Sequence, residues 1–243
     1  MRWHKESALS DHHSADDRLA NEALEEIEPG MLVGFGAGRT ASRVIQALGH
    51  RVKTEKIPVR VIAASDATEA HCREVGLEVI DFATVEELDL LIDGADEIDR
   101  SMRMLKGTRG AVARERMIAW ASRRRVYMVG AEKVSPYLGL NCTLSIAVMP
   151  FGLASTRASV RRLGLNGVMR RGLAGEFYVT DNANLILEVS LAEGVDLQEL
   201  DTELHRIPGV VEHGLFLDEA DAILIEHHDG SVETLSSDPR RFA

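Results

Sequence analysis

The chain has 243 residues, of which 45% are hydrophobic, and a formal net charge of −11 at pH 7. This length is enough for a sizeable core, in one large domain or one and a half. Because so negative a protein is repelled by phosphate backbones and anionic membrane surfaces, we expect neither nucleic acid nor a membrane as its main partner. An anionic substrate would need a local cationic pocket.

The cysteines and the apolar stretches bear on the compartment. Cys72 and Cys142 follow no pattern typical of a disulfide framework or a zinc site. No apolar run follows the first residues, and no stretch reaches the length of a membrane span. We therefore expect a cytoplasmic protein in a reducing compartment.

The first part of the chain alternates helices and strands. Apolar residues at helical spacing predict a first helix over residues 16–28, which Pro29-Gly30 ends. Strands are expected over residues 31–35, 59–63, 77–80, 88–92 and 125–130, helices over 41–48, 69–75 and 111–124, and a helical turn at 85–87. Such alternation is typical of βαβ units in a largely parallel sheet.

The pattern changes beyond residue 143. Strands are expected over residues 144–148, 177–180, 184–189 and 210–216, and helices over 154–163 and 197–206. The order β-α-β-β-α-β predicts a ferredoxin-like subdomain. A last strand over 222–226 would return to the main sheet, and the residues from 236 onward would form a tail.

The expected fold class is therefore α/β, with two domains. Residues 1–143 plus 218–243 would form a Rossmann-like catalytic domain, a mostly parallel sheet flanked by helices. Residues 144–217 would form a smaller ferredoxin-like α+β domain that serves as a lid or in oligomerisation.

A strand, a glycine-rich turn and a helix follow one another over residues 31–48. The turn, at residues 36–40 (GAGRT), leads into the helix, so free backbone N–H groups and the helix dipole would point at one place. That arrangement suits an anion. A glycine turn needed only for tight strand-to-helix geometry gives the same pattern, and the motif alone does not choose between the two interpretations.

A polar cluster follows the expected strand at residues 88–92. Residues 93–97 (DGADE) lie at its carboxyl end, where open α/β sheets place their ligands. Lys106 comes next, beside a glycine, and Glu115 follows on a helix. Moving a proton between adjacent carbons needs a carboxylate and groups that stabilise an enediolate. Charged loops and helix faces are nevertheless more often only solvated.

These segments resemble the ribose-5-phosphate isomerase A family, whose usual pattern is close to DGADEI, IKGGGgA and tREK. This chain has DGADEID at 93–99, LKG at 105–107 and AxxREr at 111–116. The further matches are VGFGAGRTA at 33–41, AASDAT at 63–68, YVTDNANLIL at 178–187 and IPGVVEHGLF at 207–216. They cover nearly the whole chain in the family's order, which is more specific than any single motif.

The resemblance implies an aldose–ketose isomerase of the pentose phosphate pathway. It would interconvert D-ribose 5-phosphate and D-ribulose 5-phosphate through a cis-enediolate, with no metal and no other cofactor. Family members are commonly dimers or tetramers, so a homodimer or homotetramer is expected.

The resemblance also implies site residues. Glu115, at the position of the family's base, would shuttle the proton, Asp93 and Asp96 would handle the hydroxyls, and Lys106 would stabilise charge. The substrate-binding residues would be Ala37, Gly38, Arg39, Thr40, Gly94, Ala95, Gly107, Thr108, Arg109 and Lys133.

The chain departs from the family's pattern at three places. Residues 36–40 (GAGRT) replace the usual GTGST, and residues 106–109 (KGTR) replace KGGG. Asp16 and Asp17 stand where a lysine that reaches the phosphate is often found. One hypothesis is that Arg39 and Arg109 grip the phosphate bidentately in place of the lost groups.

Two alternatives stay open. The same two arginines could suit another phosphorylated aldose or ketose. The chain could also be a non-catalytic sugar-phosphate sensor, because its architecture resembles the effector domain of some sugar-responsive transcription regulators. The retained Glu115 speaks against a sensor, and the residues before Asp16 are too few for a helix-turn-helix.

Overall fold

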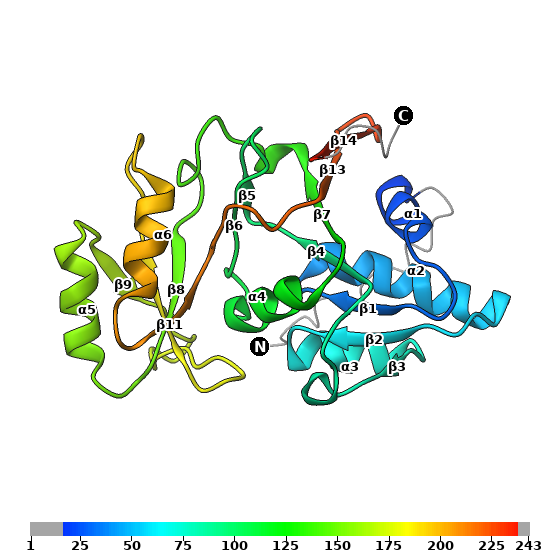
Figure 1. The fold of residues 1–243 in the computed structure, drawn as a ribbon, viewed down its shortest axis with the longest axis horizontal. Helices are drawn as coiled ribbons and strands as arrows, with labels where there is room; N and C mark the ends of the chain where they lie inside the picture. Colours follow the sequence, from blue (N-terminus) through cyan, green and yellow to red (C-terminus); the bar gives the residue numbers. More distant parts are fainter. Residues whose placement is uncertain (1–16, 238–243) are drawn as a thin grey trace, which may run out of the picture.

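The computed structural model describes residues 17–237, and its largest sheet has seven strands in the order β14-β13-β7-β4-β1-β2-β3 (Figure 1). Neighbouring strands are parallel except β13 and β14. The strands are β1 (Leu32–Phe35), β2 (Arg60–Ala63), β3 (Glu78–Val79), β4 (Leu90–Gly94), β7 (Arg125–Gly130), β13 (Ala222–Glu226) and β14 (Val232–Ser236). The prediction of a mostly parallel α/β sheet is confirmed.

Helices cover both faces of this sheet. Because successive side chains of a strand point to opposite faces, Leu90 and Ile92 of β4 pack with α1 (Arg18–Glu25), α2 (Arg39–Glu55) and α3 (Asp66–Glu74). Leu91 instead packs with α4 (Val112–Ala121) on the other face. The same cluster includes residues of the small sheet, so α4 lies between the two sheets, with its Val112, Glu115, Ile118 and Ala119 buried.

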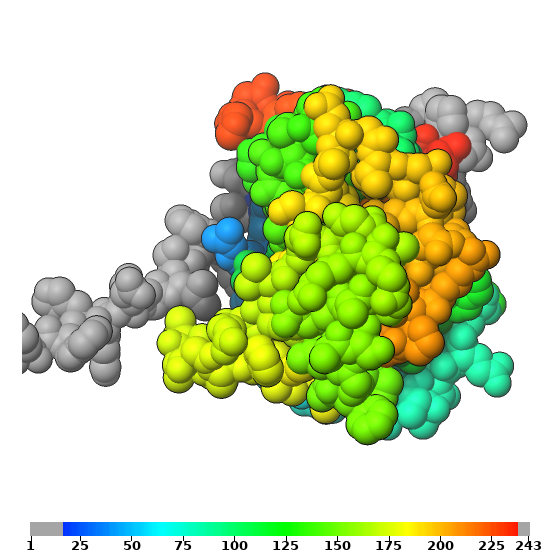
Figure 2. Space-filling model, turned by 90° about the vertical axis from the view of Figure 1, so that its left-hand side faces the viewer, coloured from blue at the N-terminus to red at the C-terminus, as the bar shows by residue number. Residues whose placement is uncertain are grey.

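The small sheet has four antiparallel strands in the order β11-β8-β10-β9. Its elements are β8 (Leu144–Val148), α5 (Leu153–Arg162), β9 (Gly167–Met169), β10 (Leu185–Val189), α6 (Leu197–His205) and β11 (Val210–His213). Figure 2 shows α5 and α6 on the face turned away from the main sheet. This order is that of a ferredoxin-like unit, as predicted. The domain bounds, 1–143 plus 218–243 and 144–217, stay a prediction.

A third sheet connects the other two. It pairs β5 (Glu97–Ile98), β6 (Met104–Leu105) and β12 (Leu215–Phe216) in the order β12-β6-β5. The prediction of a single strand over 210–216 was therefore wrong, because these residues form two strands, β11 and β12. They are divided at Gly214, which passes so close to the strand partner that a Cβ would lie 2.0 Å from the Lys106 carbonyl oxygen. The backbone of Lys106 is thereby tied to the small sheet.

Three further predictions need correction, and one strand was missed. Residues 177–180 form only isolated bridges, because Tyr178 turns back to bond with the Arg170 carbonyl, and β9 takes the place in the sheet. The edge strand β14 was not predicted; it follows a turn at Gly230 and ends at Ser236, where the predicted tail begins, and residues 238–243 of that tail lie outside the described residues. The helical turn lies at Phe82–Thr84 rather than 85–87, and α2 extends to Glu55. Within residues 17–237, no helix is long and apolar enough to span a membrane.

Candidate active site

Three ionisable side chains meet beside the carboxyl end of β4. The Lys106 ammonium lies 2.7 Å from Asp93 Oδ2 and 3.3 Å from Glu115 Oε1. It also donates a hydrogen bond of 2.5 Å to the Gly94 carbonyl. All three side chains are at most 3% exposed. One cation shared by two buried carboxylates makes the acid–base state of each group depend on the others.

Local periodicity explains why these groups meet. Asp93 follows Leu91 by two residues in β4, so its side chain points to the face covered by α4. Glu115 lies three residues before Ile118 on α4, and both belong to the buried stripe of that helix. Gly36 leaves room for the carboxylate, because a Cβ there would lie 1.6 Å from Asp93 Oδ1.

Burial sets the electrostatics of the cluster. It raises the pKa of Glu115 to about 7; Lys106 opposes this rise, and Asp93 and Asp96 add to it. Burial also raises the pKa of Asp93, against the opposing effect of Lys106. Glu115 Oε2 is buried with no hydrogen-bond partner among the described residues. A carboxyl with a pKa near neutrality and a free lone pair can both accept and return a proton.

Two aromatic rings flank the same ammonium, and the sequence did not reveal them. Lys106 Nζ lies 5.5 Å from the ring centre of Tyr127 and 5.6 Å from that of Phe216. Burial lowers the pKa of Lys106, but the negative charges of Asp93 and Glu115 raise it by more. The net effect is a raised pKa. The rings add a cation–π attraction, so the lysine is held in its charged form.

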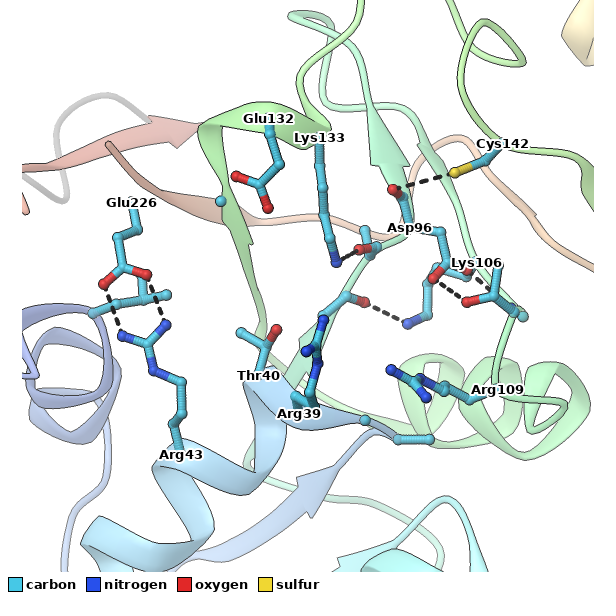
Figure 3. A pocket seen from close by; sticks show the side chains of 18 of the residues that line it. Arg39, Thr40, Arg43, Asp96, Lys106, Arg109, Glu132, Lys133, Cys142 and Glu226 are labelled. Carbon is cyan, nitrogen blue, oxygen red and sulfur yellow. Dashed lines mark hydrogen bonds and ion pairs between the residues drawn. The ribbon is translucent and has the colours of Figure 1, made fainter. Parts of the chain in front are cut away.

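A cavity of about 760 Å³ opens over this cluster (Figure 3). Every predicted site residue except Asp93 lines it: Ala37, Gly38, Arg39, Thr40, Gly94, Ala95, Asp96, Lys106, Gly107, Thr108, Arg109, Glu115 and Lys133. Asp93 lies beneath, fully buried. The prediction missed Leu19, Arg43, Gly130, Glu132, Cys142, Glu226, His227, His228 and Gly230, which form the rest of the wall.

One wall of the cavity suits an anion. Helix α2 begins after Gly38 with no side-chain cap, so its first backbone N–H groups face the cavity end unpaired by a side chain. The Arg109 side chain lies against Gly38, where a Cβ would be 3.5 Å from Arg109 Nε. Within residues 17–237 neither the Arg39 nor the Arg109 guanidinium has an ion-pair partner. Figure 3 shows both beside the start of α2.

The loop after Lys106 keeps glycine where the backbone requires it. Gly107 and Gly110 have φ of 104° and 82°, whereas Thr108 and Arg109 between them avoid the left-handed region. The departure from KGGG therefore places side chains at positions that tolerate them. Thr108 donates from both its backbone N–H, at 3.0 Å, and its hydroxyl to the Asp96 carboxylate.

Two more cations stand at the rim. Lys133 donates to the Ala95 carbonyl at 2.5 Å, so its ammonium lies over the DGAD segment. Arg43 pairs with Asp17 at 2.6 Å and with Glu226 at 2.7 Å. Asp17 thus neutralises an arginine of the cavity wall, and Asp16 lies outside the described residues.

One group in the described part of the chain has metal-ligand spacing, and it lies away from this cavity. Asp201, His205 and His213 place their polar atoms within 4.8 Å of one another. The Leu215 N–H donates to His213 Nδ1, which leaves the ring proton on Nε2, 3.1 Å from His205 Nδ1. Burial lowers the pKa of His213 to about 3, so the ring is neutral. The geometry fits internal hydrogen bonds better than a metal.

The fold and the cavity together define an α/β enzyme whose site can move a proton within a small anionic substrate. The model of the family "Ribose 5-phosphate isomerase A (phosphoriboisomerase A)" matches residues 60–230. The chain belongs to the ribose 5-phosphate isomerase A family, as the sequence motifs predicted.

Individual proteins of known sequence or structure are similar to this chain over most of its length. The ribose-5-phosphate isomerase A of Thermomicrobium roseum is 38% identical over 217 residues, 89% of this chain and 91% of that protein. The solved ribose 5-phosphate isomerase of Plasmodium falciparum superposes with a TM-score of 0.87 at 29% identity, covering 91% of this chain and 97% of that one. A D-ribose-5-phosphate isomerase in complex with phospho-erythronic acid gives 0.86 at 27% identity, with 91% and 97% covered.

Proposed function

We propose that this chain interconverts D-ribose 5-phosphate and D-ribulose 5-phosphate. The observation that carries the proposal is Glu115: a buried carboxyl with a pKa of about 7, one unpartnered oxygen, and a lysine 3.3 Å away, in the wall of a cavity with an anion-binding end. Family membership supports it independently.

In the proposed reaction, Glu115 takes the proton from C2 of the open-chain aldose and returns it to C1. The hydroxyl proton moves between O2 and O1, so no atom is gained or lost. The enediolate in between carries negative charge, which the Lys106 ammonium, 3.3 Å from Glu115 Oε1, would stabilise. Asp96, in the cavity wall, would help shuttle the hydroxyl proton, and Asp93 would take part through Lys106, which it contacts.

We assign the phosphate to the end of the cavity formed by residues 37–40 and Arg109. Backbone N–H groups at the start of α2 and the guanidiniums of Arg39 and Arg109, which have no ion-pair partner within residues 17–237, supply donors and positive charge there. The chain has a net charge of −11, so an anionic substrate needs a local cationic pocket, and this end of the cavity provides one. Lys133, over the DGAD segment, would contact the sugar.

The test is turnover by the purified chain. Ketose formation from D-ribose 5-phosphate should exceed that from other aldose phosphates when kcat/KM is compared across a panel. A different sugar phosphate ranking first would favour the alternative that Arg39 and Arg109 raise. Binding of ribose 5-phosphate without any isomerisation would instead favour the sensor.

Assembly and location extend the proposal. We propose a homodimer or homotetramer, supported by large apolar side chains exposed on the small domain, such as Phe151 at 89% and Val168 at 74%. Light scattering after size-exclusion chromatography tests it, and a monomer at micromolar concentration would contradict it.

We propose the cytoplasm as the location, supported by the free thiols of Cys72 and Cys142.

A further inference from the structure

The loop over residues 107–109 is bound from behind by the small domain. Arg170, directly after β9, donates from Nη1 to the Thr108 carbonyl at 3.0 Å and from Nη2 to the Gly107 carbonyl at 3.2 Å. The Tyr178 hydroxyl donates to the Arg109 carbonyl at 3.2 Å. Three consecutive carbonyls of one loop therefore have donors from two side chains of the small domain.

The Arg170 guanidinium is itself fixed. Its Nε donates to Glu188 Oε1 at 2.7 Å and its Nη2 to Ser145 Oγ at 3.1 Å, from two neighbouring strands of the small sheet. The guanidinium carbon lies 5.3 Å from the ring centre of Tyr178. Since the arginine side chain is only 17% exposed, its planar fork presents two N–H groups in one fixed direction.

Within the described chain the other hydrogen bonds of residues 107–109 are few: one of 2.8 Å from the Gly110 N–H to the Gly107 carbonyl, and those between Thr108 and Asp96. Thr108 and Arg109 are exposed, and the loop turns on glycines at both ends. Its front face makes the Thr108 contacts with Asp96 and places Arg109 over Gly38. The position of these cavity-lining groups therefore depends on the bonds made behind them.

We propose that Arg170 and Tyr178 are positioning residues, which fix the loop over residues 107–109 and so place Arg109 and the Asp96–Thr108 pair for substrate. Neither residue lines the cavity, so they act through the loop and not by touching the sugar phosphate. The inference rests on the proposed isomerase function, and it makes the small domain a structural part of the phosphate site.

The test compares two conservative variants with two matched controls. R170K keeps the positive charge beside Glu188 but loses the fork, and Y178F keeps the ring but loses the hydroxyl. R171K alters the next arginine, which bonds the Gly175 carbonyl and stacks on Phe177 instead. Y137F removes a hydroxyl that has no hydrogen bond within residues 17–237.

We expect R170K and Y178F each to raise KM for ribose 5-phosphate about tenfold, or about 1.4 kcal/mol, with kcat within about threefold of wild type. Amide hydrogen exchange at Thr108 and Gly110 of the free enzyme should become faster in both variants. R171K and Y137F should leave KM and exchange unchanged, and all four should keep the wild-type Tm within a few degrees.

Unchanged KM together with unchanged exchange in R170K and Y178F would overturn the inference. If R170K proves unstable, Y178F alone decides in the same way. Because exchange needs no substrate, it separates this inference from the proposed function. Wild type that does not isomerise ribose 5-phosphate refutes the function, whereas the exchange result stands by itself.

Discussion

Lys106 Nζ and Asp93 Oδ2 lie 2.7 Å apart with both side chains buried, and no other cation lies within ion-pair distance of this carboxylate in the described chain. Breaking a buried pair leaves an uncompensated charge and is strongly destabilising. The pair is therefore a structural requirement of the fold as well as a part of the site.

Replacing the lysine should show this requirement. We expect K106M to lower the free energy of unfolding by about 3–5 kcal/mol and to abolish turnover. The double variant D93N/K106M should recover a large share of the stability, but none of the activity, because one buried charge is gone. Urea unfolding at pH 7 checks both; a K106M protein as stable as wild type would contradict the account.

The pKa of Glu115 predicts the pH dependence of activity. Only the carboxylate form can accept a proton, so kcat/KM should rise with pH through about 7 and level off above it. Since Asp93 contributes to the raised pKa of Glu115, D93N should move this rise to lower pH. A pH–rate profile of both proteins gives the answer, and a D93N rise at higher pH would be inconsistent with the geometry.

Gly36 predicts a strong steric effect with a matched control. A Cβ at Gly36 would lie 1.6 Å from Asp93 Oδ1, which is buried and cannot move aside. A Cβ at Gly172 would also meet a carboxylate oxygen, Glu176 Oε1 at 2.0 Å, but that side chain is exposed and free to swing away. We expect G36A to lose activity and at least about 2 kcal/mol of stability, and G172A to behave as wild type in thermal melts.

Arg39 and Arg109, which have no ion-pair partner in the described part of the chain, predict a phosphate-specific effect. Because a bond between charged groups contributes about 1.5–3 kcal/mol, R39M and R109M should each raise KM for ribose 5-phosphate about tenfold or more. The change in kcat should be small. R161M, on the exposed face of α5, serves as the control. Unchanged KM in both variants would remove the arginines from the phosphate site and leave the α2 amides to bind it alone.

Much of the site could be predicted because the motifs follow strand ends. Parallel strands bring their carboxyl ends to one edge of the sheet, so residues 36–40 and 93–96 had to meet there. The helix that carries Glu115 was also predicted, but the buried stripe of Val112, Glu115 and Ile118 was not, and Glu115 was assigned through the family motif.

What escaped prediction depends on long-range pairing. Asp93 is buried because its side chain points to the face of β4 that α4 covers. The motif alone does not show which face that is. Tyr127 lies opposite Asp93 in the β4–β7 register, and Phe216 reaches Lys106 through the pairing of β12 with β6. The sequence around Tyr127 and Phe216 does not show which residues of another strand they will pair with. The edge strand β14 was missed because its side chains are all only partly buried, so its apolar pattern is weak.

The most direct test of the central claim is the turnover of E115Q. Glutamine keeps the shape of Glu115 but cannot accept the proton, so kcat should fall by about 10²–10⁴, while Tm and the Kd for ribose 5-phosphate stay near wild type. E74Q, at an exposed position on α3, should change none of these quantities. An E115Q enzyme that turns over ribose 5-phosphate at close to the wild-type rate would show that this glutamate does not move the proton.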